Sequence, residues 1–312
     1  MNIVFLDRES IGSDIDLSEF SELGNVTMYD YSTPEEARER IKDADIIIVN
    51  KIPVNESTIG GADKLKLVCV SATGTNNLDK AYLAERGIEW RNVAGYSTES
   101  VAQHTFALLF YIWEHLPYYD AYVQEGRYAD DRMFTHFAKT FLELSGKTWG
   151  IIGLGTIGRK VAEIATAFGC KVQYYSTSGR NSTQDYKRVS FEELLATSDI
   201  VSIHAPLNEQ TEGLINATAL KQMKKTAVLL NVGRGPIIVE QDLLDAIQNG
   251  TIAAAGLDVL SVEPMSKQSP FYGVKDSRLF ITPHIAWASI EARARLMHMI
   301  ADQIREFEAA QK

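Results

Sequence analysis

In the stretch GIIGLGTIG, residues 150–158, Gly153, Gly155 and Gly158 separate an apolar run from an amphipathic pattern at residues 159–168. A strand that ends there and a helix that begins there would form the turn that holds a dinucleotide pyrophosphate. In such a turn Gly153 allows the tight bend, Gly155 lets the backbone approach the pyrophosphate, and Gly158 lets the helix pack closely. The N-terminus of the helix would then direct N–H groups at the anion. A glycine-rich turn without a ligand is the alternative.

Short runs rich in β-branched residues recur along the chain, and helical patterns lie between several of them. This alternation predicts an α/β protein with parallel sheets. A chain of 312 residues is larger than most single cores, so two domains are expected. The expected strands are NIVFL, VTMYD, DIIIVN, LKLVCVSA and IEWRNV, followed by a series of six, KTWGIIG, CKVQYYS, DIVSIHAP, TAVLLNVG, IAAAGLDV and RLFITPHI.

Two long helices are also expected. One runs from about residue 99 to residue 124 and should be kinked or broken at Pro117. The other begins near Ala288 and should bury one face, because its apolar residues recur at helical spacing. The change of pattern at these helices places the domain boundaries after residues 98 and 285.

The formal net charge of −10 argues against a nucleic-acid or anionic-membrane partner, because such partners require a basic surface. The start, MNIVFLDRES, has no basic region ahead of its apolar residues, unlike a secretory signal. The longest apolar stretch, from Val101, is shorter than the ~20 residues of a membrane-spanning helix. Cys69 and Cys170 lie in apolar runs and are expected to be buried thiols. We therefore expect a soluble, cytoplasmic protein.

The strand after the glycine turn ends without the acidic residue that accepts from the ribose 2′-hydroxyl of NAD. Ser176, Thr177 and Arg180 stand there instead, and they could donate to a 2′-phosphate. The sequence therefore favours NADP(H) as the cofactor, with NAD(H) possible if these are only solvated loop residues.

Polar residues follow the later strands, at the edge of an α/β sheet where ligands bind. Arg234 has glycines on both sides and could hold a carboxylate with two hydrogen bonds. Glu263 and His284 could form a carboxylate–imidazole pair that favours the charged ring and donates a proton. Each has a plainer alternative: an arginine at a helix end, a solvated loop carboxylate, or a histidine near an interface. The residues expected at the nucleotide crevice are His204, Ala205, Pro206, Val232, Gly233 and Asp258.

The remaining histidines give weaker signals. His104, His115 and His298 lie in expected helices and are interpreted as packing or surface residues, and His136 lies in an irregular stretch. Their spacing does not indicate a metal site.

Over nearly the whole chain, the ordered motifs resemble those of the D-isomer-specific 2-hydroxyacid dehydrogenase family. The matching stretches are SATGTNNLD, NVAGYSTESVAQH, GLGTIG, NVGRGPIIVEQDLLDAI, AAGLDVLSVEP and TPHIAW. Among subgroups, the chain looks most like the glycerate dehydrogenases, also called hydroxypyruvate reductases. It departs from the common pattern at Ser71, where glycine is frequent, and at Ser176, where the cofactor-selecting acid often stands.

The resemblance implies two doubly wound parallel-sheet domains, with a Rossmann NAD(P)-binding domain at 99–285 inserted into a flavodoxin-like substrate domain at 1–98 and 286–312. It implies that Arg234 binds the carboxylate and carbonyl of the substrate, that His284 is the acid/base, and that Glu263 supports His284. The backbone of Ala72, Thr73 and Gly74 would donate to the same carboxylate, while Thr156, Ile157, Val232 and Asp258 would line the nucleotide.

The implied reaction is NAD(P)H-dependent reduction of a small 2-keto acid, with hydroxypyruvate or glyoxylate favoured, and the reverse oxidation. The alternatives are a D-lactate dehydrogenase-type enzyme and a nucleotide-sensing binding protein resembling corepressors of this family. A homodimer is also expected, because the helix from about Glu99 carries Phe106, Leu109, Phe110 and Trp113, more apolar surface than one domain should expose.

Overall fold

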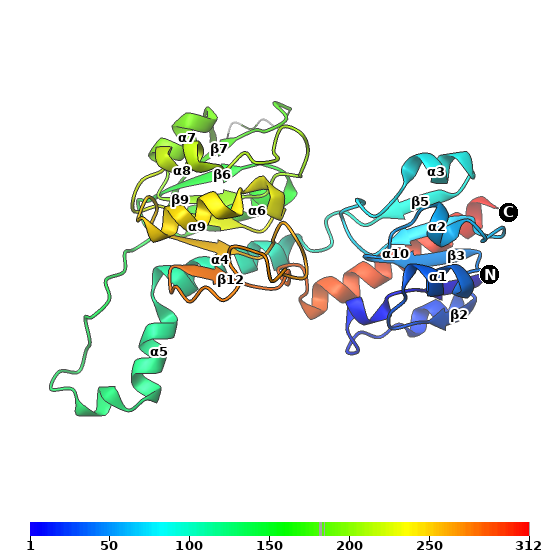
Figure 1. Cartoon of the computed structure of the whole chain (residues 1–312), viewed down its shortest axis with the longest axis horizontal. Coiled ribbons are helices and arrows are strands. Elements are labelled where there is room, and N and C mark those ends of the chain that lie inside the picture. Colours follow the sequence, from blue (N-terminus) through cyan, green and yellow to red (C-terminus); the bar gives the residue numbers. More distant parts are fainter. Residues whose placement is uncertain (181–182, 184, 312) are drawn as a thin grey trace. The chain divides into compact units, whose positions relative to one another are not determined.

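The computed structural model describes residues 1–180, 183 and 185–311. The chain divides into two compact units, Met1–Ser97 with Ala288–Lys312, and Thr98–Trp287 (Figure 1). The second unit is therefore inserted into the first. The expected boundaries, after residues 98 and 285, differ from this division by one and two residues. The substrate-binding and nucleotide-binding roles of the two units stay predictions.

The first unit contains a five-stranded parallel sheet in the order β2-β1-β3-β4-β5. This order, 2-1-3-4-5, is that of flavodoxin-like folds, as predicted. The strands are β1 (Asn2–Phe5), β2 (Asn25–Met28), β3 (Ile46–Val49), β4 (Leu67–Val70) and β5 (Glu89–Asn92).

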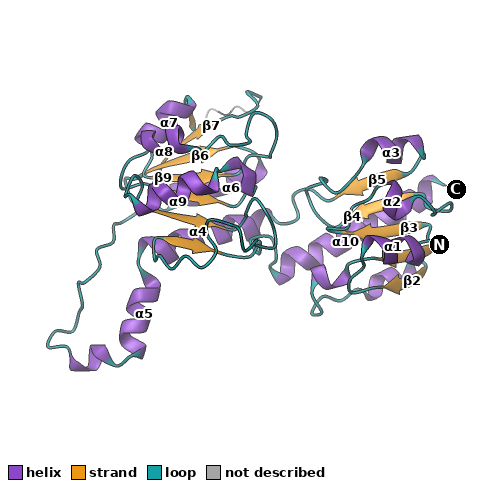
Figure 2. Cartoon of the chain, viewed as in Figure 1, coloured by secondary structure: helices purple, strands orange, loops and turns teal. Residues whose placement is uncertain are grey.

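Helices cover both faces of this sheet (Figure 2). On one face α1 (Pro34–Arg40), α2 (Glu56–Ile59) and α3 (Lys80–Glu85) pack against alternate strand residues. On the other lie α10 (Ile290–Ala310) and the 3₁₀ helix η2 (Ser18–Glu22), where the rings of Phe5 and Phe20 meet edge to face at 5.0 Å. α10 buries an apolar face, as its spacing predicts, formed by Leu296, Ile300, Ile304 and Phe307 among others.

The second unit contains a seven-stranded parallel sheet in the order β12-β11-β10-β9-β6-β7-β8. This is the doubly wound dinucleotide-binding order, with its switch point between β6 and β9. The expected six strands are present, and the seventh, β8, has only two residues, too few for a sequence pattern. The strands are β6 (Thr148–Ile152), β7 (Lys171–Tyr175), β8 (Lys187–Arg188), β9 (Ile200–Ile203), β10 (Val228–Asn231), β11 (Ala254–Leu257) and β12 (Leu279–Ile281).

Successive strand residues of this sheet enter separate apolar clusters on its two faces. One cluster contains α4 (Thr98–Trp113) and α6 (Thr156–Ala167), and the other contains α7 (Phe191–Thr197), α8 (Ala217–Gln222) and α9 (Glu240–Gln248). Phe106, Leu109 and Trp113 are buried in the first cluster. The expectation that these residues leave an exposed apolar surface is therefore wrong, because α6 and the sheet of the same unit cover them.

The expected long helix is broken into two. α4 ends at Trp113, and α5 (Leu116–Gln124) begins after His115, whose φ of 54° is left-handed. Pro117 lies in the first turn of α5, where its missing N–H needs no acceptor. The break at the proline is thus present, and His115 lies in the break rather than in a helix.

Residues 116–141, which we call the arm, follow this break. The arm comprises α5, the 3₁₀ helix η3 (Arg127–Asp130) and an irregular segment, and it projects away from the sheet of its unit (Figure 1). Two further 3₁₀ helices, η1 (Arg8–Ile11) and η4 (Gly235–Ile237), lie outside the arm. Across the described residues, no helix combines the length and apolar character needed to cross a membrane. Cys69 and Cys170 are buried free thiols, as predicted.

Candidate active site

The glycine turn lies between β6 and α6, at the switch point of the sheet. Gly153 has a φ of +93°, and a Cβ there would lie 2.8 Å from the backbone of Ala205, which follows β9. A Cβ on Gly158 would lie 2.3 Å from the carbonyl oxygen of Gly153. Both glycines therefore permit close backbone packing that any side chain would prevent.

Gly155 differs from these two glycines, because a Cβ there would meet no atom within 4 Å. It is the N-cap of α6 and supplies no side-chain acceptor to the first turn of the helix. Thr156 is exposed and Ile157 partly exposed at this helix start. The N–H groups of the first turn and the open space beside Gly155 fit a pyrophosphate.

His204 follows β9 at the same edge, between Ser202 and Ala205. The hydroxyl of Ser202 accepts from Nε1 of Trp149 at 2.8 Å and lies 3.0 Å from Nε2 of His204. Burial lowers the pKa of His204 to about 3, so the ring is neutral at physiological pH. Its Nδ1 is buried and has no partner among the described residues. Ala205 is buried and its backbone lies against Gly153, whereas Pro206 is exposed.

The end of β7 carries the residues expected to select the cofactor. Ser176 is buried, and its hydroxyl has no partner among the described residues, whereas Thr177 is partly exposed and Arg180 exposed. Nη1 of Arg188, in β8, donates to the carbonyl of Gly179 at 3.3 Å. Arg188 could not be predicted at this turn from the sequence, since only the pairing of β7 with β8 brings it there.

Arg234 lies in the turn after β10, which Asn231 shapes. The Asn231 side chain accepts from the N–H of Gly233 at 3.0 Å and donates to the carbonyl of Arg234 at 3.0 Å. Val232 is buried and Arg234 partly buried. The guanidinium donates to the carbonyl of Gly233 but forms no ion pair with any residue that the structure describes. Its charge is therefore available to an anionic ligand.

Gly235 brings the turn of Arg234 against the loop that carries Glu263. A Cβ on Gly235 would lie 1.9 Å from the carbonyl carbon of Leu260, so only glycine allows the two loops to touch. The N–H of Leu260 in turn donates to Oε1 of Glu263 at 2.9 Å. The two predicted site loops are thus packed together within the second unit.

Glu263 and His284 form the predicted pair, with Oε2 and Nδ1 2.7 Å apart. A carboxylate only accepts, so Nδ1 carries the proton and Nε2 is the ring nitrogen left for a ligand. The side chains of Glu263 and His284 are 32% and 26% exposed, so a ligand can reach the pair.

Asp258, at the end of β11, holds the turn that carries His284. Its backbone carbonyl accepts from the N–H of His284, Oδ1 from that of Ile285 and Oδ2 from that of Ala286, at 2.8–2.9 Å. His284 has a φ of +56°, which is rare for a residue with a side chain. Asp258 therefore fixes a left-handed turn, a role that the sequence did not predict. Its expected contact with the nucleotide stays a prediction.

His104 of α4 extends this network through Thr282. The hydroxyl of Thr282 donates to Oδ1 of Asp258 at 2.6 Å, so it accepts from Nε2 of His104, 3.0 Å away. Burial lowers the pKa of His104, and the nearby Asp258 carboxylate opposes that shift. The sequence placed His104 among packing or surface residues. Nothing in the pattern could reveal a contact across 178 residues of chain.

Ala72, Thr73 and Gly74 belong to the first unit and follow the carboxyl end of β4. Ala72 and Gly74 are partly exposed and Thr73 is exposed. Ser71, where the family pattern often has glycine, is buried and donates from its hydroxyl to the carbonyl of Val49 at 3.2 Å. The serine therefore attaches this loop to the end of β3.

These features define an α/β protein with a dinucleotide-binding turn, an available arginine and a carboxylate–imidazole pair at the carboxyl ends of parallel strands. The family model described as D-isomer specific 2-hydroxyacid dehydrogenase, NAD binding domain, matches residues 106–286. The chain belongs to this family, and its cofactor is a nicotinamide dinucleotide. The resemblance drawn from the motifs is confirmed.

Relatives of nearly equal length support the same assignment. A hydroxypyruvate reductase of Blautia hydrogenotrophica is 38% identical, over 98% of this chain and 97% of the relative. A glycerate dehydrogenase of Methylorubrum extorquens is 35% identical, over 98% and 96%. Among solved structures, an acyclic imino acid reductase in complex with NADPH and D-Arg has a TM-score of 0.87 and 31% identity, covering 99% of this chain and 98% of that one.

Proposed function

We propose that the protein reduces a small 2-keto acid, hydroxypyruvate or glyoxylate, to the D-2-hydroxy acid and catalyses the reverse oxidation. The observation that carries this proposal is the 2.7 Å contact between Glu263 and His284. Arg234, without an ion pair in the described part of the chain, follows a strand of the same sheet. The names of the two relatives support hydroxypyruvate as the substrate.

In the proposed mechanism the nicotinamide, when bound, supplies a hydride to C2 of the keto acid. Negative charge develops on the carbonyl oxygen. His284, doubly protonated before this step, transfers the proton of Nε2 to that oxygen and becomes neutral, while its Nδ1–H stays bonded to Glu263. Arg234 binds the substrate carboxylate and carbonyl through its planar set of N–H donors. The backbone of Ala72, Thr73 and Gly74 also donates to the carboxylate.

The direct test is a steady-state panel of hydroxypyruvate, glyoxylate and pyruvate with each nicotinamide cofactor. Replacing His284 with alanine should lower kcat by ~10²-fold or more, because general acid catalysis of this kind contributes 10²–10⁴-fold. Cofactor binding should be nearly unchanged, since the ring acts on the substrate. Preference for pyruvate would favour a D-lactate dehydrogenase-type enzyme. Cofactor binding without turnover of any acid would favour a nucleotide-sensing protein.

We propose NADPH as the better cofactor. The support is the missing acid at the end of β7 and the two exposed arginines there, Arg180 and Arg188. Ser176 carries no charge that would repel a phosphate, and its buried hydroxyl, which has no partner among the described residues, could donate to one. The S176D variant should prefer NADH, and R188A should lose NADPH efficiency with little change for NADH. Equal or better wild-type kcat/KM with NADH would refute this preference.

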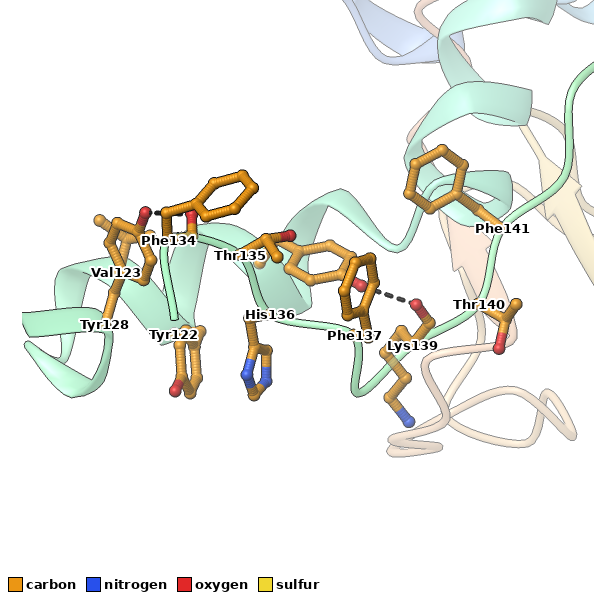
Figure 3. Close-up of a pocket in the computed structure, with 11 residues that line it drawn as sticks. Tyr122, Val123, Tyr128, Phe134, Thr135, His136, Phe137, Lys139, Thr140 and Phe141 are labelled. Atoms are coloured by element: carbon orange, nitrogen blue, oxygen red, sulfur yellow. Dashed lines mark hydrogen bonds between the residues drawn. The ribbon is translucent and has the colours of Figure 1, made fainter. Parts of the chain in front are cut away.

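We also propose a cytoplasmic homodimer, in which the arm contacts the second copy. The arm carries aromatic side chains that its own unit leaves uncovered, including Phe134 and Phe137, each 84% exposed. Figure 3 shows these rings along a hollow of the arm, where Tyr122 stacks on His136 at 3.9 Å. Exposed apolar surface of this kind indicates a protein interface. A monomeric mass in light scattering at micromolar concentration would contradict the proposal.

A further inference from the structure

The loop after β4 in the first unit departs from strand geometry at Thr73. In a regular strand, successive carbonyls point to opposite sides. Here the carbonyl of Ala72 accepts from the N–H of Val93 at 3.2 Å, and the carbonyl of Thr73 accepts from Nδ2 of Asn92 at 2.7 Å. Both acceptor bonds come from the end of β5. Two successive carbonyls are therefore held on the same side of the loop.

This arrangement fixes the direction of two N–H groups. The carbonyl and the N–H of one trans peptide point in nearly opposite directions. The N–H groups of Thr73 and Gly74, which share peptides with the two held carbonyls, therefore both point away from β5. Neither has an acceptor within the part of the chain that the structure describes. Successive N–H groups that point to one side form an anion-binding concavity.

We propose that Asn92 is a positioning residue for the substrate carboxylate. This inference rests on the proposed function and deepens it. The Asn92 amide turns the Thr73–Gly74 peptide so that the Gly74 N–H joins that of Thr73 on the ligand side. Without the amide, the Thr73 carbonyl could turn back to the side that strand alternation favours, and the two donors would diverge.

The surrounding contacts hold Asn92 itself in place. Its backbone carbonyl accepts from Nε2 of Gln303 in α10 at 2.9 Å, and Nη1 of Arg91 donates to the carbonyl of Gln303 at 2.8 Å. The hydroxyl of Thr73 donates to the carbonyl of Val93 at 3.0 Å, which adds a third bond between the loop and β5. The Asn92 side-chain amide thus extends from a strand end that α10 holds. Its hydrogen bond to the Thr73 carbonyl sets the direction of the Gly74 N–H.

The test compares N92D and N92A with the wild type. Aspartate has the same shape but places an acceptor against the Thr73 carbonyl, and alanine removes the amide without adding charge. We expect KM for the 2-keto acid to rise about tenfold in both, with kcat and the cofactor KM changed less than threefold, because the N–H groups bind the carboxylate equally in ground and transition states. The matched control is N77D, because Asn77 makes the same kind of bond to a carbonyl of the first unit, that of Ile52, at 3.0 Å.

A second readout does not depend on turnover. Oxalate binding to the cofactor-loaded protein, measured by calorimetry, should weaken about tenfold in N92D and N92A and stay unchanged in N77D. Unchanged KM and unchanged oxalate affinity in N92A would overturn the role of Asn92, and so would an equal effect in N77D. If the wild type reduces no 2-keto acid, the proposed function fails, while oxalate affinity still decides whether Asn92 supports an anion site. If the wild type does not bind oxalate either, the inference fails as well.

Discussion

Glu263 Oε2 lies 2.7 Å from Nδ1 of His284, while Glu263 Oε1 accepts from the N–H of Leu260 at 2.9 Å. The carboxylate therefore bridges the imidazole and the loop that touches Gly235, next to Arg234. Ring orientation and loop position are coupled through one side chain. A change at Glu263 should thus affect proton transfer more than cofactor binding.

Replacing Glu263 with glutamine keeps the shape and removes the charge. We expect kcat for keto-acid reduction to fall by roughly tenfold or more, which is less than the full loss of general acid catalysis because His284 remains. The check is kcat for the 2-keto acid and the KM for the cofactor in both proteins. An unchanged kcat would remove Glu263 from proton transfer.

Replacing Thr282 with valine should displace His284, although the Thr282 side chain has no hydrogen bond to the His284 ring. Valine keeps the branched shape but loses the hydroxyl that donates to Asp258 and accepts from His104. We expect kcat to fall about tenfold, since the positioning of a catalytic group is sensitive to small displacements. The T282S variant retains the hydroxyl and should recover most of the activity. Equal kcat in the valine and serine variants would contradict the role of the hydroxyl.

Two of the turn glycines, Gly153 and Gly155, should separate stability from cofactor affinity. A methyl group at Gly155 meets no protein atom, so G155A should keep the wild-type Tm but bind NADPH at least tenfold more weakly, because the methyl occupies the space of the pyrophosphate. G153A should unfold at lower temperature, because its φ of +93° and the Ala205 backbone both oppose a side chain, at a cost of about 1–3 kcal/mol or more. Thermal melts and calorimetric titration check both. Wild-type NADPH affinity in G155A would place the pyrophosphate elsewhere.

His204 should make the fold sensitive to acid. Burial lowers its pKa from 6.5 to about 3, so between these values the unfolded chain binds a proton that the folded chain does not. The free energy of unfolding should therefore fall as the pH decreases from about 6.5 towards 3. In H204Q this contribution disappears, and the difference between the two stability profiles isolates it. Parallel profiles over this range would show that the ring titrates normally in the fold.

The predictable parts of this protein were those carried by local patterns. Apolar runs predicted all strands except the two-residue β8, and the spacing of Gly153, Gly155 and Gly158 predicted the turn between β6 and α6. The contact between Glu263 and His284 was also predicted, whereas the catalytic roles of these two residues and of Arg234 stay predictions. These signals are local because each depends on a strand or turn whose residues are adjacent in sequence.

The remaining parts depend on contacts between distant segments. Arg188 reaches the end of β7 only through strand pairing, and His104 reaches Thr282 across 178 residues. The apolar face of α4 was misassigned for a similar reason, since the sequence does not say that α6 covers Phe106. The three hydrogen bonds that Asp258 accepts from successive N–H groups likewise leave no periodic pattern in the sequence.

The insertion of one unit into the other has a consequence for synthesis on the ribosome. Residues 98–287 emerge as an uninterrupted segment that contains every strand of the second sheet. The first unit, by contrast, lacks α10 until the last part of the chain has been made, and α10 supplies the Gln303 contacts at the end of β5. The nascent second unit can therefore complete its core while the first still exposes the sheet face that α10 will cover. Ribosome-bound chains stalled before residue 290 should display that face to chaperones.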